Sequence, residues 1–251
     1  YPNDGTDEGR RLRLKQQHFF VSCSLQDMLR SLEKRSIPIT EFPKHWTVQL
    51  NDTHPAIAVA ELMRLLIDQY QIGWDKAWNI TTSSVAYTNH TLLPEALEKW
   101  DLGLFNDLLP RHLEIIYEIN WRFLQQLRLR YPGDDKILQK LSIIDEEGSK
   151  SVRMAHLATI GAHHINGVAA LHSDLIKRQL LPEFAALWPE KFTNVTNGVT
   201  PRRWVALSNP SLSNLLEEEV GPNWITNMEL LKKLEEKKDD NNFLQKFEET
   251  K

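Results

Sequence analysis

A short apolar strand that runs into a polar turn and then into a helix most constrains the fold, and the sequence contains this unit twice. WTVQLNDTHP at 46–55 is the first copy, in which Asp52 or Thr53 is predicted to cap the following helix. SVAYTNHT at 84–91 is the second, with a helix predicted from Pro94 through Trp100. This alternation predicts a layered α/β fold. Ligands bind such folds at the carboxyl ends of the strands, where both polar turns are expected.

Helical periodicity accounts for most of the remaining chain. It predicts an amphipathic helix from Leu12 to Leu32, a long helix from Pro110 to Tyr131 and another from Arg153 to about Leu171. A short β-type run in FTNV then leads through an Asn-Gly turn to Pro201. We therefore predict two domains, residues 1–200 and residues 201–251.

The net charge and the short apolar runs argue against a nucleic-acid partner and against a membrane-spanning segment. Lys+Arg 30 against Asp+Glu 34 give a formal net charge of -4, so no excess positive charge is available to bind a nucleic-acid backbone. The apolar runs are much shorter than the roughly 20 residues that a membrane span requires. We therefore expect neither a nucleic-acid partner nor a membrane span.

The single cysteine favours a cytoplasmic location. Cys23 cannot form an internal disulfide, and no charged-then-apolar leader precedes it. No basic residue lies near it in the sequence to activate the thiol. Cys23 is therefore expected to be a buried, inert thiol rather than a nucleophile.

The nine histidines form no metal-binding motif, because neither HExxH nor Cys-x-x-Cys occurs. On one predicted helix, His156 and His163 would lie about 10 Å apart along the axis, too far for one ion. His163 and His164 would diverge around that axis. We therefore predict no bound metal, and leave a site assembled from distant turns as a minor alternative.

Several polar and aromatic groups have both a functional and a structural interpretation. Asp52, Glu95 and Glu98 could supply the two acids of a glycoside hydrolase, or could serve as a helix cap and first-turn acids. The Arg202-Arg203 pair beside Trp204 could clamp a phosphate or anchor a loop. Tryptophans suit sugar faces, but helical patterns favour a core role for four of them: Trp74, Trp78, Trp121 and Trp188.

Five long segments, in this order, resemble the glycogen and α-1,4-glucan (maltodextrin) phosphorylase family: QLNDTHPAIAVAELMRLL, AYTNHTLLPEALEKW, LLPRHLEIIYEIN, MAHLATIGAHHINGVAALHS and NVTNGVTPRRW. The similarity runs from YPND at the start to about residue 210. It implies a partial glycosyltransferase-B-like fold, with 1–200 as the later half of the N-terminal glucan-binding domain and 201–251 as the start of the C-terminal domain. The chain is thus expected to be an internal fragment.

The resemblance also implies an activity. Family members are transferases of carbohydrate metabolism that degrade glycogen: they use inorganic phosphate to release a terminal α-1,4-linked glucose as glucose 1-phosphate. They carry pyridoxal phosphate on a lysine in a Gly-rich motif that this sequence does not contain. The 251-residue chain is therefore expected to be inactive alone, and the full-length protein to be a cytoplasmic homodimer. The gate sequence NDGTDEG lacks the aromatic pair of animal relatives, so animal-type allosteric regulation is not carried over.

The resemblance assigns roles to individual residues. His90 and Asn197 match the groups that contact a hydroxyl of the glucose, and an imidazole and an amide can both donate and accept hydrogen bonds. The further assignments are Val168 in the pocket lining; Asp52, His54, Glu98 and Thr91 in the wall beside the glucose; Asn3 and Asp4 in the gate loop; and Trp204 near the cofactor.

Two other functions remain open at this point. The chain could be a noncatalytic glucan-binding or interaction module that keeps the sugar-contacting turns. It could also belong to a retaining or inverting hydrolase, which would release reducing glucose without phosphate. The preferred glucan, whether glycogen, starch or maltodextrin, depends on grooves that this sequence does not complete.

Overall fold

The chain forms two compact units, which are described separately. The computed structural model describes residues 5–93, 95 and 97–250. Unit 1 comprises Tyr1–Thr196 and unit 2 comprises Asn197–Lys251. This division falls before the predicted boundary at 200, and the assignment of the two ranges to the two domains of an enzyme stays a prediction.

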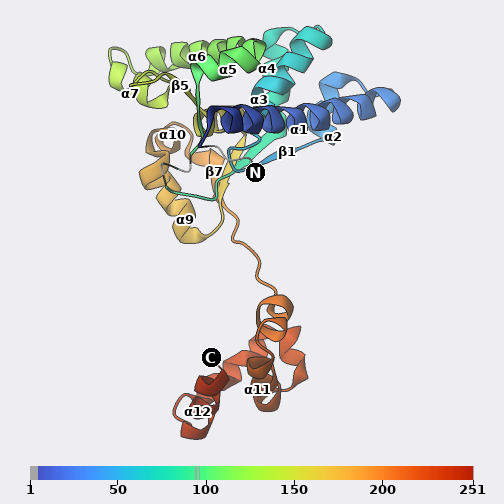
Figure 1. Ribbon diagram of the computed structural model, residues 1–251, viewed down its shortest axis with the longest axis vertical. Coiled ribbons are helices and arrows are strands. Elements are labelled where there is room, and N and C mark those ends of the chain that lie inside the picture. Colours follow the sequence, from blue (N-terminus) through green and yellow to red (C-terminus); the bar gives the residue numbers. More distant parts are fainter. Residues whose placement is uncertain (1–4, 94, 96, 251) are drawn as a thin grey trace. The chain divides into compact units, whose positions relative to one another are not determined.

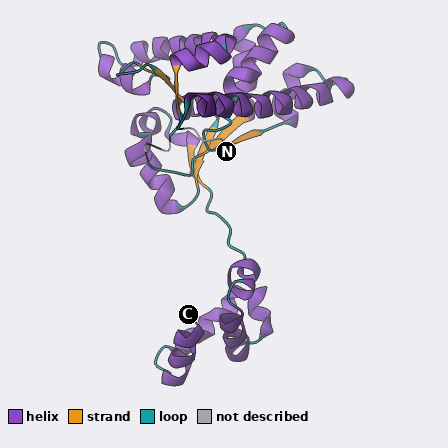
Figure 2. Cartoon of the chain, viewed as in Figure 1, coloured by secondary structure: helices purple, strands orange, loops and turns teal. Residues whose placement is uncertain are grey.

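Unit 1 is built on a parallel sheet of four strands in the order β1-β2-β6-β7 (Figures 1 and 2). Asn51 pairs with Thr88 across the first two strands, and Thr88 pairs with Asn166 on the third. The strands are β1 (Val48–Asn51), β2 (Val85–Thr88), β6 (His164–Gly167) and β7 (Phe192–Asn194). The predicted α/β fold class is confirmed, and the carboxyl ends of all four strands meet at one edge of the sheet.

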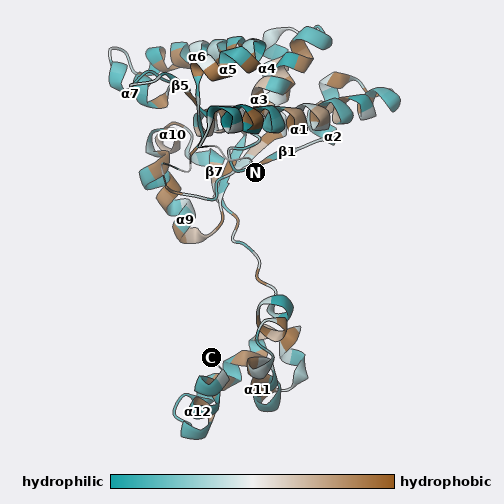
Figure 3. Cartoon of the chain, in the orientation of Figure 1, coloured by the Kyte–Doolittle hydropathy of each residue, from teal (hydrophilic) through white to brown (hydrophobic). Residues whose placement is uncertain are grey.

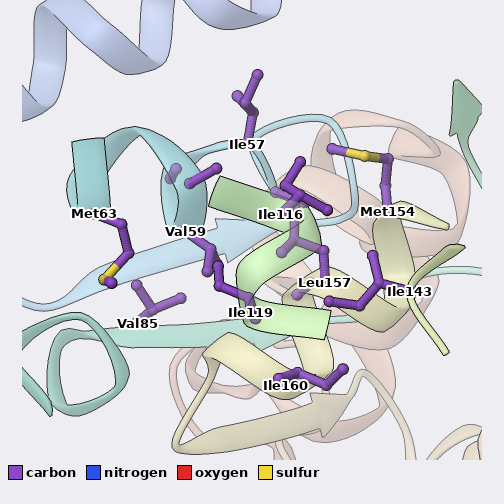
Figure 4. Packing of buried hydrophobic residues seen from close by; sticks show 14 of the residues in the cluster. Ile57, Val59, Met63, Val85, Ile116, Ile119, Ile143, Met154, Leu157 and Ile160 are labelled. Atoms are coloured by element: carbon purple, nitrogen blue, oxygen red, sulfur yellow. The ribbon is translucent and has the colours of Figure 1, made fainter. Parts of the chain in front are cut away.

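The helices next to this sheet have apolar residues spaced at the helical period of 3.6 residues, which places these residues on one face that can pack in the core. Figure 4 shows Val59 of α3 (Ala58–Arg64) close to side chains of helices α6 (Pro110–Arg130) and α8 (Met154–Gly161), and Met63 of the same helix close to Val85. Val85 of β2 joins the same cluster. The predicted long helix from Pro110 is confirmed as α6.

The remaining helices of unit 1 enclose this core. The predicted amphipathic helix is confirmed and is longer than expected, because α1 extends over Asp7–Lys34 with Thr6 as its N-cap. The other helical elements are η1 (Ile39–Glu41), α2 (Phe42–His45), η2 (Leu65–Gln69), α4 (Trp74–Ser84), α5 (Leu102–Leu108), α7 (Asp135–Leu141), α9 (Ala170–Leu175), η4 (Ile176–Leu180), α10 (Pro182–Leu187) and η5 (Pro189–Lys191).

Three local predictions are wrong. Lys99–Asp101 forms strand β3 instead of the end of a helix through Trp100, because it pairs with β5; Pro94 lies outside the described residues. The predicted helix from Arg153 to Leu171 is interrupted by β6, whose pairing with β2 and β7 outweighs local helix propensity. Neither Asp52 nor Thr53 caps α3, because that helix begins only at Ala58 and Ile57 is its N-cap.

The predicted burial of Cys23 is also wrong, because its side chain is exposed. The buried face of α1 contains Val21, Leu25 and Leu29, and Cys23 lies off that stripe. The position of Cys23 around the helix axis determines its exposure. The absence of a basic residue nearby in the sequence carries no information about that position.

A three-stranded antiparallel sheet in the order β3-β5-β4 flanks the core. It consists of β3, β4 (Ile144–Asp145) and β5 (Ser151–Arg153). Asp145 ties these strands together, because its carboxylate accepts hydrogen bonds from Lys99 Nζ at 2.8 Å and from Arg153 Nη2 at 2.8 Å. The bond from Arg153 contributes most to lowering the pKa of Asp145 below its usual range.

We expect Asp145→Asn to destabilise unit 1 by about 1.5–3 kcal/mol at pH 7, the range for hydrogen bonds to a charged group. The carboxylate's pKa is lower in the folded chain, so its contribution is present above the unfolded value of about 3.9 and is lost as the pH falls further. Urea unfolding at pH 7 and at pH 3 measures this difference. If the free energies of unfolding of the wild type and Asp145→Asn differed by the same amount at pH 7 and at pH 3, the prediction would be contradicted.

Unit 2 contains only helical elements among its described residues, 197–250 (Figure 2). They are η6 (Arg202–Leu207), α11 (Pro210–Val220), η7 (Pro222–Ile225), η8 (Met228–Lys237) and α12 (Asn241–Thr250). Leu215, Leu216, Trp224 and Phe243 supply its buried apolar side chains. Both hydrophobic and hydrophilic residues occur along α11 and α12, as expected for helices with one buried face (Figure 3).

No helix in the described part of either unit is both long enough and apolar enough to span a lipid bilayer.

Candidate functional site

Polar side chains line the carboxyl edge of the parallel sheet, where the sequence placed the ligand site. Thr88 Oγ1 donates to Asn166 Oδ1 at 2.8 Å and accepts from Gln49 Nε2 at 2.8 Å. Asn194 at the end of β7 bonds instead to helix α9, because its Oδ1 accepts from Ser173 Oγ at 2.8 Å. Side-chain hydrogen bonds therefore connect β1, β2 and β6, and a separate bond ties the end of β7 to α9.

The turn after β1 has an unusual backbone at Asp52. This residue has a φ of 70°, in the left-handed region that aspartate tolerates better than most residues with a Cβ. Its N–H donates to the Thr88 carbonyl at 2.9 Å, and its Oδ1 accepts from Thr53 N at 2.7 Å. This conformation turns the chain directly after β1. Asp52 and Thr53 therefore lie at the sheet edge, and α3 begins only at Ala58.

Four of the predicted glucose-wall residues line one cavity of about 870 Å³ beside this turn: Asp52, His54, Thr91 and Glu98. The other lining residues are Arg10, Arg13, Glu95, Leu97, Lys99 and Trp100. The cavity therefore combines carboxylates, guanidinium groups and an imidazole with an indole, a set that can hydrogen-bond hydroxyls and pack against a sugar ring. The three carboxylates considered for a hydrolase, from Asp52, Glu95 and Glu98, all reach it.

Glu98 is held in place by helix α1. Its Oε1 accepts from Gln17 Nε2 and from Arg13 Nη2, each at 2.9 Å. Its side chain is only 10% exposed, so the ion pair with Arg13 is largely shielded from water. A carboxylate fixed in this way can accept a hydrogen bond from a hydroxyl group in the cavity and hold that group in one orientation.

His90 lies on the adjacent turn and does not line this cavity. Its exposed ring places Nε2 against Asn51 Oδ1 at the end of β1. Behind it, buried Asn89 accepts from His172 Nε2 at 2.8 Å and donates to the Tyr87 hydroxyl. Burial, and to a smaller extent His90, lower the pKa of His172, which favours the neutral imidazole. His90 thus projects from a turn that buried hydrogen bonds hold rigid.

Val168 follows the end of β6 at the same edge and is half-buried. The preceding Gly167 lies against the first turn of α9, where an added Cβ would come within 2.9 Å of the Ser173 backbone. Its carbonyl accepts from Val195 N at 3.1 Å. This close approach fixes where Val168 leaves the sheet.

Two predicted site residues, Asn197 and Trp204, belong to unit 2 and are described within that unit. Asn197 is the first residue of that unit and is exposed. Trp204 is 59% exposed, and the Arg203 guanidinium lies over its ring, 5.3 Å from the centroid. The gate residues Asn3 and Asp4 lie outside the described residues. The roles of these four residues stay predictions.

Sequence reasoning missed the groups that support the site: Arg13, Gln17, Asn89 and His172. Arg13 and Gln17 lie four residues apart on one face of α1, and both bond to Glu98. The spacing alone does not identify Glu98 as their shared partner. Asn89 belongs to the NHT turn that the sequence identified, but its neighbour His90 was chosen as the functional group.

The predicted core role of Trp121 is wrong, because this side chain is 55% exposed. It lines a second cavity of about 750 Å³. Trp74, Trp78 and Trp188 line the same cavity and are partly buried against the core.

The predicted placement of His163 and His164 is also wrong. Both lie beyond the end of α8, and their Nδ1 atoms are 2.7 Å apart. The loop between α8 and β6 brings the rings together instead of letting them diverge around a helix axis.

Comparison with known proteins identifies the family. A family model described as carbohydrate phosphorylase matches residues 1–251. The chain is 62% identical to a glycogen phosphorylase of Synechocystis sp. over 94% of the chain and 28% of that protein. It is 51% identical to the Chlamydia trachomatis glycogen phosphorylase over 98% of the chain and 30% of that protein. It is 48% identical to the Saccharomyces cerevisiae glycogen phosphorylase over 100% of the chain and 28% of that protein.

The chain thus spans less than a third of the length of these curated relatives. Because the family model covers its whole length, the part present here is a continuous segment of that family's sequence. The chain belongs to the carbohydrate phosphorylase family.

Proposed function

We propose that the protein to which this chain belongs is a glucan phosphorylase. It would transfer a terminal α-1,4-linked glucose of glycogen, starch or maltodextrin to inorganic phosphate and release glucose 1-phosphate. The observation that carries this proposal is the cavity at the carboxyl edge of the sheet, which collects Asp52, His54, Thr91 and Glu98 from separate segments. Relatives named glycogen phosphorylase support the same activity.

In this proposal, unit 1 binds and orients the sugar. His90, supported by Asn51, would hydrogen-bond a hydroxyl of the reacting glucose, and Asn197 would share that hydroxyl. Glu98 and Asp52 would form the polar wall, and Val168 would line the pocket. Fixed groups of this kind lower the barrier by holding the ring where positive charge develops at its anomeric carbon.

The family's cofactor, pyridoxal phosphate, would be contacted from unit 2. Trp204 offers an exposed indole face, and the adjacent Arg203 guanidinium suits an anionic planar group. When bound, the cofactor supplies a phosphate that acts as acid–base partner to the substrate phosphate. The chain contributes packing and charge at this position, while the family's cofactor lysine belongs to a motif that this sequence does not contain.

Partners and location follow from the same proposal. The substrates would be an α-1,4-glucan and inorganic phosphate, and the full-length protein would form a homodimer in the cytoplasm. The isolated 251-residue chain is expected to produce negligible glucose 1-phosphate, because it would lack the phosphate-binding half of the site.

The test is to express the full-length protein and measure glucose 1-phosphate formed from maltodextrin and phosphate. We expect His90→Ala to lower kcat/KM by about tenfold to a hundredfold, because a hydroxyl of the bound sugar that loses its hydrogen-bond partner in the enclosed site costs about 1–3 kcal/mol. His45→Ala on α2 is the matched control, because His45 is exposed and lies outside the lining of the cavity. The control is expected to keep the wild-type rate.

Other outcomes would identify the competing functions. Release of reducing glucose in the absence of phosphate would indicate a hydrolase. Binding of glucan without turnover by the full-length protein would indicate a noncatalytic glucan-binding module. An unchanged kcat/KM in His90→Ala would remove His90 from the proposed site.

A further inference from the structure

Three side chains that the proposed phosphorylase site does not use meet where helices α1, α3 and α6 pack together (Figure 1). They are His18 of α1, Glu61 of α3 and His112 of α6. Their potential ligand atoms all lie within 4.8 Å of one another. The His18 and His112 rings stand edge to face, with centroids 4.8 Å apart. We refer to these three residues as the helix-junction cluster.

Glu61 is fully buried and presents a fixed carboxylate to this cluster. Its Oε1 accepts from Ser22 Oγ at 2.6 Å and from Arg64 Nη2 at 2.9 Å. Its Oε2 accepts from Arg64 Nε at 2.7 Å and lies 2.6 Å from His112 Nε2. The carboxylate is thus oriented by hydrogen bonds from outside the cluster, as carboxylates that bind metal ions commonly are.

His18 leaves the cluster incomplete. Its Nε2 is buried, yet it lies 3.8 Å from Glu61 Oε2, too far for a hydrogen bond. The atom has no hydrogen-bond partner among the described residues. A buried imidazole nitrogen close to a carboxylate and to another imidazole, without a hydrogen bond to either, is free to coordinate a ligand.

We propose that the helix-junction cluster binds a zinc ion through His18 Nε2, His112 Nε2 and Glu61 Oε2. Two imidazoles and one carboxylate are a ligand set that zinc uses in proteins, with a water as fourth ligand. Zinc–ligand bonds of about 2.0–2.2 Å in a tetrahedron place neighbouring ligand atoms about 3.4 Å apart. The distances from Glu61 Oε2 to the two histidine nitrogens, 2.6 and 3.8 Å, lie on either side of that value.

A cavity on the His18 side of the cluster provides a route by which an ion would enter. A cavity of about 490 Å³ reaches His18 and is also lined by Lys15, Gln16 and Phe19 of α1 and by Leu108 and Leu109 before α6. His18 is 27% exposed at its side chain, while Glu61 and His112 are buried. An ion could therefore enter past His18 and take the place of the proton between His112 and Glu61. Arg64 would remain on the outer side of the carboxylate and keep it oriented.

Such an ion would join three helices that come from distant parts of the sequence. Zinc binding would therefore stabilise unit 1, by an amount that rises with the logarithm of the free zinc concentration above the Kd. The proposal does not depend on the phosphorylase activity, because none of the three ligands lines the glucan cavity.

The test uses the complete 251-residue chain, freed of metal with a chelator and titrated with Co²⁺ and with Zn²⁺. We expect one Co²⁺ per chain with the intense visible bands of a tetrahedral site, displaced by Zn²⁺, and a rise in the thermal unfolding midpoint with added zinc. His18→Gln is expected to weaken zinc binding by tenfold or more while leaving the metal-free midpoint near that of the wild type.

Two control variants separate this site from surface binding. His45→Gln removes an exposed histidine, and His164→Gln breaks the His163–His164 pair, whose Nδ1 atoms are close enough to capture an ion adventitiously. Both should retain the tetrahedral Co²⁺ spectrum. Loss of binding in His164→Gln with retention in His18→Gln, or the absence of saturable binding in the wild type, would overturn the proposal and leave a metal-free hydrogen-bond network.

Discussion

Replacing Glu61 by alanine is expected to destabilise metal-free unit 1 by about 3–5 kcal/mol, the cost of removing one partner from a buried ion pair. The Glu61 side chain is completely buried, and four hydrogen-bond donors from Ser22, Arg64 and His112 depend on it. Burial by itself would raise the pKa of Glu61, but the bonds from Arg64 and His112 hold it below its usual range. Alanine would leave the half-buried Arg64 guanidinium and the buried His112 ring without their carboxylate.

This loss is a large fraction of the total stability of a domain, which is about 5–15 kcal/mol. Urea unfolding in the presence of a chelator measures it through the midpoint and slope of the transition. Glu114→Ala on α6 is a matched control, because Glu114 pairs with Arg111 at the surface and is 66% exposed. Its cost should stay below about 1 kcal/mol. Equal effects of the two substitutions would show that the buried network contributes no more than a surface ion pair.

Gly167→Ala is expected to destabilise unit 1 by about 1–3 kcal/mol through overpacking, and also to disturb the proposed sugar site. The new Cβ would lie 2.5 Å from Ser173 Oγ and 2.9 Å from the Cα and N of the same residue. A side-chain oxygen can rotate away, but the backbone of α9 cannot do so without moving the helix. In the full-length protein, the shift would displace the adjacent Val168 and lower glucan affinity.

The measurement combines urea unfolding of the 251-residue chain with glucan binding by the full-length protein. Gly73→Ala serves as the control, since no atom lies within 4 Å of its added Cβ and its cost as an N-cap change should stay near about 1 kcal/mol or less. If Gly167→Ala is no more destabilising than Gly73→Ala, the close approach of β6 and α9 is not essential to the fold.

The sequence supported the fold class because strand pairing and helix packing both leave periodic patterns. WTVQL and SVAYT were identifiable as strands, and the stripe from Leu113 to Leu127 marked α6. The stretch from Arg153 to Leu171 failed because β6 owes its strand conformation to β2 and β7 on either side, and such non-local pairing leaves no periodic signal within the segment itself.

The candidate site was predictable only in part, for a related reason. Strand ends followed by polar turns identified Asp52 and His54, and the resemblance added Thr91 and Glu98. The groups that hold them, such as Arg13 on α1, reach the site through tertiary packing that no local pattern encodes. The helix-junction cluster shows the same limit, because its ligands come from three helices and have no shared spacing.

The order of strands in the parallel sheet has a consequence for folding kinetics. β1 pairs with β2, β2 with β6 and β6 with β7. Each pairing joins strands that are separated by helical segments, so the entropy cost of closing the intervening chain precedes the gain from strand pairing. In unit 2, α11 instead packs against its sequence neighbours η6, η7 and η8. A refolding experiment should therefore show two phases, with the fluorescence of Trp224 in unit 2 recovering before that of the tryptophans in unit 1.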